Sequence, residues 1–237
     1  MLRYIDGKKL GRSVHAWLDS RHHFSFAEYY NPANMQFGDL RVLNDDLVRP
    51  GKGFDTHPHK NMEVLSYVVR GELTHEDSMG NRSSLTRGQV QYMSAGTGIF
   101  HSEYNNRADE PLRFLQIWIL PDRNGYAPCY GEYRFALEER MNRWLPIAAG
   151  ANNADNGSPI RIHADVYAFA TILTQGGDLE FIVSRNRQAY MVLIEGAVRV
   201  GELSLFACDA LEITEQTIRL HALENAHILL IEMAKSA

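Results

Sequence analysis

The chain has 237 residues, of which 24 are Lys or Arg and 29 are Asp or Glu, giving a formal net charge of −5 at pH 7. Apolar residues make up 45% of the sequence, enough for the core of one large domain or two small ones, which excludes a disordered tail protein. The mild acidity argues against direct nucleic-acid binding, because such proteins need a basic surface to neutralise phosphates.

The longest nearly apolar stretch, residues 114–120, is much shorter than the roughly 20 residues that cross a bilayer. The N-terminal segment MLRYIDGKKLGRS carries charges, and no apolar segment follows it, so it does not resemble a signal peptide. Two cysteines, Cys129 and Cys208, form neither a disulfide framework nor a CxxC motif. We therefore expect a cytoplasmic protein without a membrane partner.

Short apolar or alternating runs bounded by Gly, Pro, Asn and Asp predict strands along the whole chain. The clearest are residues 40–43, 63–69, 90–93, 113–120, 168–173, 189–194, 217–220 and 226–232. Many short strands with regular turns indicate a sandwich or a barrel. Residues 133–144 (YRFALEERMNRW) are the best helical candidate because their apolar residues are spaced like one helix face. Residues 148–159 (AAGANNADNGSP) are predicted to form a surface linker.

The sequences before and after this linker resemble each other when Gly71 is aligned with Gly196, at an offset of 125 (196 − 71). Such similarity indicates a weak two-fold internal repeat. At this offset His57 corresponds to Ile182 and His59 to Ser184. The second half therefore keeps the scaffold and lacks the polar cluster of the first, which predicts a structural role for it.

His57 and His59 are two residues apart, so on an extended strand both imidazoles point to the same face. His101 and Glu103 repeat this spacing after the turn SAGTG. Two neighbouring antiparallel strands would direct three nitrogens and one carboxylate toward a common point. Four such groups in a dry interior would be costly without a cation, so the pattern predicts a metal site. A set of three His and one carboxylate suits Fe(II), Mn(II), Ni(II), Co(II) or Cu(II) with open coordination positions.

The strings GKGFDTHPHKNME (residues 51–63) and GIFHSEYN (residues 98–105) resemble the two motifs of the cupin superfamily. Together with HFSFAEYYNP, LRVLNDD and HEDSMGN, they resemble the pirin family most. The resemblance implies an all-β bicupin, two stacked antiparallel β-barrels of the jelly-roll type with few short helices. It also implies one metal, held by His57, His59, His101 and Glu103, whereas Glu63 stays outside the ligand set.

The expected domains follow from this resemblance. Residues 1–135 would form the metal-binding cupin domain, residues 136–159 a short helix and linker, and residues 160–237 a degenerate cupin domain without metal. The expected cofactor is one divalent transition metal, with Fe(II) first and Mn, Ni, Co, Cu or Zn as alternatives.

The resemblance implies quercetin 2,3-dioxygenase activity, in which a flavonol-like aromatic substrate and dioxygen react with release of carbon monoxide. Glu103 is the expected catalytic residue, because it is the nearest group to take the proton of the substrate hydroxyl. The alternative is a metal- or redox-responsive regulatory protein that binds a protein partner without turnover. A third interpretation is a relic that binds metal only.

Other polar and aromatic residues have alternative explanations. The pair His22 and His23 is expected in a packing or surface role, and His75 and Glu76 at solvated strand ends. The run 44–46 (NDD) would be a turn or a support for the site. The aromatic side chains at positions 24–37 would pack the barrel or form a wall for a planar substrate.

Overall fold

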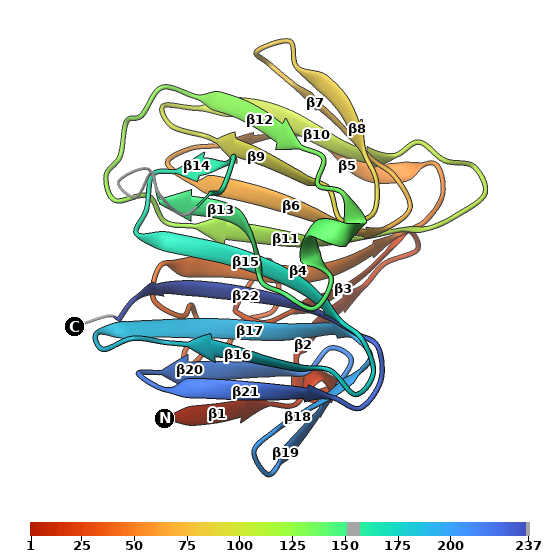
Figure 1. The fold of residues 1–237 in the computed structure, drawn as a ribbon. Coiled ribbons are helices and arrows are strands. Elements are labelled where there is room, and N and C mark those ends of the chain that lie inside the picture. The colour runs from red at the N-terminus through yellow and green to blue at the C-terminus, as the bar shows by residue number, and fades with distance from the viewer. Residues whose placement is uncertain (151–156, 236–237) are drawn as a thin grey trace. The chain divides into compact units, whose positions relative to one another are not determined.

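The computed structural model describes residues 1–150 and 157–235. In these ranges the chain is built of antiparallel strands with two short 3-10 helices, η1 (Gly7–Lys9) and η2 (Leu137–Arg140). The expected all-β class is therefore confirmed (Figure 1). Contacts divide the chain into a first unit, Leu10–Phe135 with Ile162–Ala164, and a second unit, Met1–Lys9, Ala136–Arg161 and Asp165–Ala237.

The first unit contains a seven-stranded and a four-stranded sheet. The larger sheet has the order β12-β9-β6-β11-β4-β3-β2 and the smaller has the order β5-β10-β7-β8. The strands are β2 (Gly11–Val14), β3 (Leu18–His22), β4 (Leu40–Val48), β5 (Lys52–His59), β6 (Glu63–Arg70), β7 (Leu73–Asp77), β8 (Arg82–Leu85), β9 (Val90–Ser94), β10 (Ile99–Asn105), β11 (Leu112–Ile119) and β12 (Cys129–Tyr133). Apolar side chains of both sheets form one core cluster, which includes Leu18, Val48, Leu73 and Phe114.

The second unit repeats this arrangement. Its larger sheet has the order β1-β20-β17-β22-β15-β13-β14 and its smaller sheet has the order β16-β21-β18-β19. The strands are β1 (Leu2–Ile5), β13 (Leu145–Gly150), β14 (Arg161–Ile162), β15 (Val166–Leu173), β16 (Asp178–Ile182), β17 (Arg187–Glu195), β18 (Ala197–Val200), β19 (Leu203–Phe206), β20 (Ala210–Thr214), β21 (Thr217–Ala222) and β22 (Ala226–Ala234). The strands from β4 to β11 have the same sheet order as those from β15 to β22, as the repeat predicts, and the larger sheets differ in their outer strands.

The glycines on which the repeat was aligned occupy the same turn in each unit. Gly71 lies between β6 and β7 with φ of 78°, and Gly196 lies between β17 and β18 with φ of 85°. A Cβ at Gly196 would lie 2.1 Å from the carbonyl oxygen of Asn225, and one at Gly71 would lie 2.6 Å from that of Pro111. Both positions need glycine for its positive φ and for the close backbone approach.

Strand β1 belongs to a different unit from the one that the sequence predicted. The sequence analysis placed residues 1–9 in the first domain, whereas β1 pairs with β20 in the second unit, with Leu2 opposite Ile213. Arg3 Nε donates a hydrogen bond to Glu212 (2.6 Å). In the sheet order of the first unit, β12 takes the place that β1 takes in the second. A partner about 200 residues away leaves no local pattern, so the sequence did not show this pairing.

The predicted helix over residues 133–144 is wrong except for the single turn η2. The chain leaves β12 at Tyr133, and Asn142 adopts a positive φ of 53° that ends any helix. The aromatic residues that suggested one helix face pack separately, Phe135 on Tyr133 and Trp144 on Phe181. Loose apolar spacing was therefore mistaken for helical periodicity.

The predicted linker over residues 148–159 is wrong at its start. Ala148 and Ala149 are fully buried in β13 and pair with Ala168 and Tyr167 of β15. Small side chains here allow close packing. Residues 151–156 lie outside the described residues.

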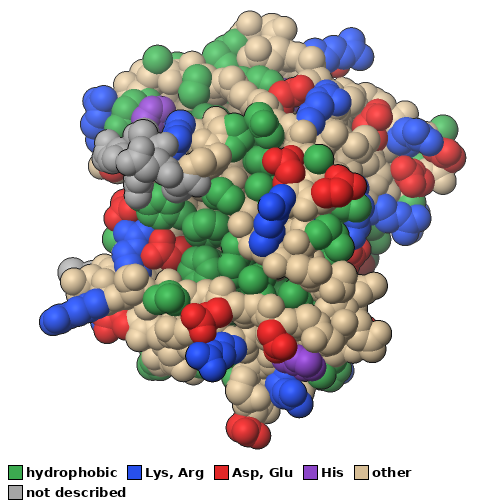
Figure 2. All heavy atoms as spheres, viewed as in Figure 1, with side chains coloured by type: hydrophobic (Ala, Val, Ile, Leu, Met, Phe, Trp, Pro, Cys, Tyr) green, Lys and Arg blue, Asp and Glu red, His purple; other side chains and the backbone are tan. Residues whose placement is uncertain are grey.

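On the face shown in Figure 2, Lys and Arg side chains lie among Asp and Glu side chains. Cys129 and Cys208 are half-buried and are not joined by a disulfide. Among the described residues, no helix is long and apolar enough to span a membrane.

Candidate metal centre

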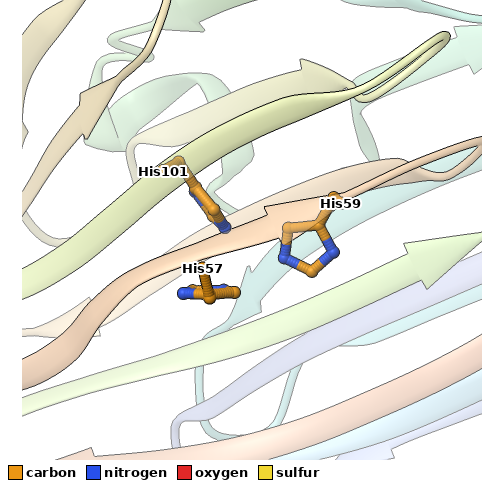
Figure 3. A group of neighbouring side chains, drawn as sticks. All are labelled: His57, His59 and His101. Atoms are coloured by element: carbon orange, nitrogen blue, oxygen red, sulfur yellow. The ribbon is translucent and has the colours of Figure 1, made fainter.

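Three imidazoles meet between two neighbouring strands of the smaller sheet of the first unit. In the pairing of β10 with β5, His101 lies directly opposite His57, and Ile99 lies opposite His59. One ring nitrogen of each His lies within 4.8 Å of one ring nitrogen of each of the other two. The ring centroids are 4.5 to 4.9 Å apart, and Figure 3 shows the three side chains converging. The structure thus brings together the three histidines that the sequence singled out.

A β-bulge shapes the wall beside this cluster. Between the pairs His101–His57 and Glu103–Phe54, β5 contains one more residue than β10. Regular alternation would have turned Asp55 to the same face as the histidines. The extra residue instead turns Phe54 toward the interior, where it lines the cavity, and Asp55 bonds the hydroxyl of Tyr104. The bulge therefore replaces an acidic side chain by an aromatic one next to the centre.

The hydrogen bonds of two histidines leave one nitrogen of each ring free for a metal. His57 Nδ1 donates to the carbonyl oxygen of Asp55 (2.7 Å), so its Nε2 has a lone pair. His101 is fully buried, and its Nε2 has no hydrogen-bond partner among the described residues. A buried polar nitrogen without a partner is costly, and a bound cation removes that cost. The residues present therefore fit a divalent transition metal, which neutral imidazoles bind well.

Electrostatics keep two of these rings neutral. Burial, together with the neighbouring imidazoles of His101 and His57, lowers the pKa of His59 to about 4. Burial, with His57 and His75 nearby, lowers the pKa of His101 to about 3. At neutral pH both rings are thus unprotonated, as a metal ligand must be.

Glu103 lies on β10, two residues after His101, and is almost fully buried. Its Oε1 accepts hydrogen bonds from Ser66 Oγ (2.6 Å) and Gln91 Nε2 (2.7 Å), and its Oε2 accepts one from Gln116 Nε2. The carboxylate lies outside the cluster of ligand atoms within 4.8 Å that the described residues form. It lines the same cavity as His57.

A cavity of about 250 Å³ opens beside the histidines, and a neighbouring cavity of about 660 Å³ shares part of its wall. The shared wall residues are Trp17, Phe26, Phe54, His57 and Trp118. Together the two volumes fall within the roughly 300–1,000 Å³ of typical small-molecule sites. The combination of four aromatic rings and one candidate ligand suits a planar aromatic molecule placed against the metal.

Known protein families match both halves of the chain. The Pirin family matches residues 6–119, and the quercetinase C-terminal cupin domain matches residues 147–233. A candidate quercetin 2,3-dioxygenase of Pseudomonas aeruginosa is 43% identical, with 95% of this chain and 97% of the relative covered. The chain belongs to the pirin family. The resemblance found in the sequence is thereby confirmed.

Two comparisons with Escherichia coli proteins add to this. The quercetin 2,3-dioxygenase of strain K12 is 40% identical to this pirin-family chain over 94% of each protein. The crystal structure of the bacterial pirin YhhW in complex with nickel(II) superimposes with a TM-score of 0.92 at 37% identity, covering 100% of both chains. A divalent metal in a pirin thus has a solved example, and the three-His cluster here suits such an ion.

Behind Glu103, a row of polar residues crosses the inner face of the larger sheet in this pirin-family protein. The row contains His22, Asn44, Gln116, Ser66 and Gln91, each paired with the next across neighbouring strands. Three of its members donate the hydrogen bonds that hold the Glu103 carboxylate. The sequence did not predict this support. Its signal in β6 and β11 was one polar residue, Ser66 or Gln116, inside an apolar run.

The expectation of a turn at residues 44–46 is wrong, because these residues are in β4. Asn44 and Asp46 face the cavity, whereas Asp45 pairs with Arg113 (2.6 Å). Asp46 Oδ1 is buried without a hydrogen-bond partner in the part of the chain that the structure describes, and burial raises the pKa of Asp46 to about 7.

The sequence left open whether the aromatic residues at positions 24–37 pack the core or line a substrate wall, and the structure places them differently. Phe26 lines the cavity and packs edge-on against Trp118, whereas Phe24 is in the core and Tyr30 is exposed. His22 also lines the cavity, bonded to Ser13 (2.9 Å) and Asn44 (2.9 Å).

Glu63 forms hydrogen bonds with residues outside the histidine cluster. Its carboxylate accepts hydrogen bonds from Tyr92 (2.5 Å), Ser94 (2.7 Å) and the backbone N–H of His163 (3.2 Å). The ring of His163 stacks on Tyr126 with centroids 3.7 Å apart. These contacts give Glu63 a structural role within the first unit.

The burial of His75 differs from the sequence prediction. The sequence placed His75 and Glu76 at a solvated strand end, which holds for the exposed Glu76 and is wrong for the fully buried His75. Alternation with the core residue Leu73 on the same strand was the signal for this burial. The ring of His75 lies 5.3 Å from that of His101, centroid to centroid.

Proposed function

We propose that this protein is a metal-dependent dioxygenase that opens the ring of a flavonol such as quercetin with dioxygen and releases carbon monoxide. The observation that carries the proposal is the convergence of three imidazoles, one with a buried unpartnered nitrogen, beside an aromatic cavity. The names of relatives at 40% and 43% identity support the same substrate class.

Within the proposed reaction, the cavity wall binds and orients the substrate. Trp118 and Phe26 meet edge to face (5.4 Å), as do Trp17 and Phe54 (5.1 Å), so the walls are rigid. A planar ring system between them would exclude water from the reacting carbon atoms. His57 belongs to both cavities and would bring the ligand set into contact with the substrate.

Glu103 is the proposed base and the fourth metal ligand. A divalent cation held by the histidines would lower the pKa of a bound substrate hydroxyl. Glu103, whose carboxylate is fixed by Ser66, Gln91 and Gln116, is placed in the same cavity to accept that proton. Glu103 lies two residues after His101 on the same strand, and as a fourth ligand its carboxylate would exchange one of these hydrogen bonds for the metal.

Fe(II) is the proposed native ion. Three nitrogen ligands and one carboxylate without a thiolate resemble the sites of non-haem iron oxygenases, which keep coordination positions open. Nickel is the ion in the solved bacterial pirin, so the experiment below compares both.

The test is anaerobic reconstitution of the metal-free protein with Fe(II), Ni(II), Mn(II), Co(II) or Cu(II), followed by quercetin and air. We expect dioxygen uptake and carbon monoxide in equal amounts with at least one ion. His59→Ala should abolish metal binding and turnover, whereas His221→Ala, which changes a histidine of β21 in the second unit, should change neither.

Two results would reject the proposal. One is the absence of dioxygen uptake with every ion although the ion binds stoichiometrically. The other is unchanged turnover in His59→Ala, which would place the chemistry elsewhere.

One observation favours the regulatory alternative as a second candidate. A surface depression of about 220 Å³ reaches His101 from outside the smaller sheet, and the neighbouring Phe100 is 53% exposed. A protein partner bound there would contact a residue next to the metal. If this role applies, hydrogen exchange of β7 and β10 should differ between the Fe(II) and Fe(III) forms; identical exchange would exclude it.

A further inference from the structure

The motif HEDSMGN, residues 75–81, has no role in the proposed function so far. It begins at the end of β7, which pairs with β10 so that Asp77 lies opposite His101 and His75 lies opposite Glu103. The side chains of His75 and Asp77 are fully buried and form a contact of 3.2 Å between Nε2 and Oδ2. A buried histidine–carboxylate pair thus lies directly beside the candidate metal ligands.

The contacts of Asp77 decide where the proton of His75 lies. Its Oδ1 accepts hydrogen bonds from the backbone N–H groups of Met79 (2.9 Å) and Asn81 (3.1 Å). Asn81 Nδ2 donates to Oδ2 (2.8 Å). Every neighbour is a donor, so the Asp77 carboxylate is an acceptor and His75 Nε2 must carry the hydrogen.

The other nitrogen of His75 is therefore an acceptor in the neutral ring. Gln91 Nε2 lies 3.4 Å from His75 Nδ1, and His101 Nδ1 lies at the same distance from it. The orientation of the Gln91 amide is fixed independently, because the same nitrogen donates to Glu103 Oε1 (2.7 Å). The second hydrogen of this amide nitrogen goes to Ser66 Oγ (3.1 Å), so the single lone pair of His75 Nδ1 accepts the hydrogen of His101 Nδ1.

We propose that Asp77 and His75 are positioning residues that fix the Nδ1–H tautomer of His101 and so direct the lone pair of its Nε2 at the metal. This inference rests on the metal centre of the proposed function. One assignment of protons satisfies the hydrogen bonds that lead from Asp77 through His75 to His101. It leaves His101 Nε2 without a hydrogen-bond partner, which is what the described residues show. Partners of this kind commonly contribute a factor of 10 to 100 in metal affinity.

Packing is the competing explanation for His75. Its ring stacks on Tyr130 with centroids 4.6 Å apart, and Tyr130 bonds Ser83 and Glu132. A purely structural His75 would affect stability and leave the His101 tautomer unchanged. The test must therefore read the tautomer and the metal affinity as well as folding.

Three variants separate these explanations. Asp77→Asn keeps one oxygen for the turn at Met79 and Asn81 but places an NH₂ group opposite His75 Nε2, which reverses the preferred tautomers of both rings. His75→Leu removes the acceptor. His75→Asn places an amide oxygen close to the position of Nδ1 and should restore the hydrogen-bond acceptor for His101. Glu76→Gln, an exposed change on the same strand, is the matched control.

The measurement has two parts. Nitrogen NMR of the metal-free protein reports the tautomer of His101, and competition with a chelator reports the dissociation constant for Co(II). We expect the Nδ1–H form in the wild type and in Glu76→Gln, and the Nε2–H form in Asp77→Asn. Co(II) binding should weaken about 10- to 100-fold in Asp77→Asn and His75→Leu, and recover to within about threefold in His75→Asn.

Other outcomes overturn the inference. In one such outcome, Asp77→Asn leaves the His101 tautomer, the Co(II) affinity and the melting temperature unchanged. This result would show that the pair does not act on His101. Equal loss of affinity in His75→Leu and His75→Asn would show that packing alone matters. Failure of the proposed function is distinguishable, because the wild-type protein would then lack turnover while these tautomers and affinities still differ between variants.

Discussion

At the residue scale, the centre depends on lone pairs of imidazole nitrogens whose protons are held elsewhere. His57 donates to a backbone oxygen, and His101 has a buried imidazole as neighbour on its other nitrogen. Burial keeps His59 and His101 neutral. The site is thus arranged for a cation before any cation binds, which lowers the cost of binding.

Glu103→Gln tests the proposed base. The amide keeps the size of the side chain, but it cannot accept a substrate proton, so kcat should fall by about 10²- to 10⁴-fold. Stoichiometric binding of Co(II) to the three histidines should persist with weaker affinity. Steady-state dioxygen uptake checks this, with the exposed Asp109→Asn as control. A kcat within about threefold of the wild type would remove Glu103 from the proton transfer.

Asp46→Asn tests the buried carboxyl of the cavity wall. Burial raises the pKa of Asp46 to about 7, an effect that the hydrogen bond from Ser20 opposes and the charges of Asp45 and Glu103 increase. The unfolded group titrates near pH 4. At this group the folded state therefore binds more protons than the unfolded state between pH 4 and 7, and the contribution of Asp46 to the free energy of unfolding falls as the pH rises through this window.

Asp46→Asn should remove this pH-dependent loss of unfolding free energy. In the metal-free protein, Asp46→Asn should gain about 1–4 kcal/mol over the wild type on going from pH 4 to 7. Urea denaturation at several pH values measures the difference. A gain that does not depend on pH would show that Asp46 is ionised in the folded protein as it is in solution.

Alternation on strands predicted the shared face of His57 and His59, and the distant His101 was found because the same spacing recurs. His75 was missed, although Leu73 two residues earlier is a core residue. The polar row behind Glu103 was missed because its members come from five strands, and the order of those strands cannot be read from local sequence.

At the scale of elements, the pairing of β5 with β10 places the centre, and the bulge in β5 decides that Phe54 rather than Asp55 lines the smaller cavity beside it. Sequence predicted the two strands and not the bulge, because an extra residue leaves no signal in composition. The helix predicted after β12 failed for a related reason, since its apolar residues belong to separate packing sites.

Gly196→Ala tests the turn that both units share. The added Cβ would lie 2.1 Å from the Asn225 oxygen at a φ of 85°, so we expect a loss of more than about 2 kcal/mol in unfolding free energy. Gly201 has a φ of 56° and open space around its Cβ position. Gly201→Ala should therefore cost only about 1 kcal/mol. Equal losses in the two variants, measured by thermal unfolding, would contradict the role of the close approach.

At the scale of the whole molecule, the two units share the sheet order of their central strands and have different interiors. The second unit is filled by an apolar cluster that includes Leu193, Leu211, Leu220 and Leu230. The first unit has polar residues and a cavity at the corresponding sheets. The internal repeat was predictable because its glycines and strands recur at fixed spacing, whereas the pairing of β1 in the second unit was not.

The acid sensitivity of the metal-free protein should come from the histidine cluster. His59 has a folded pKa of about 4, against about 6.5 when unfolded, so the unfolded state binds more protons between these values. The contribution of His59 to the unfolding free energy therefore falls as the pH drops from about 6.5 to 4, opposite in sign to that of Asp46. His59→Ala should reduce this fall in urea titrations. An unchanged slope would mean that His59 is protonated in the folded protein.

The most direct test of the account is a crystal of protein loaded with Ni(II), with anomalous diffraction recorded at the nickel edge. We predict one strong peak per chain, within bonding distance of His57, His59 and His101. A peak in the second unit instead, or an absent peak between these three imidazoles, would contradict the central claim.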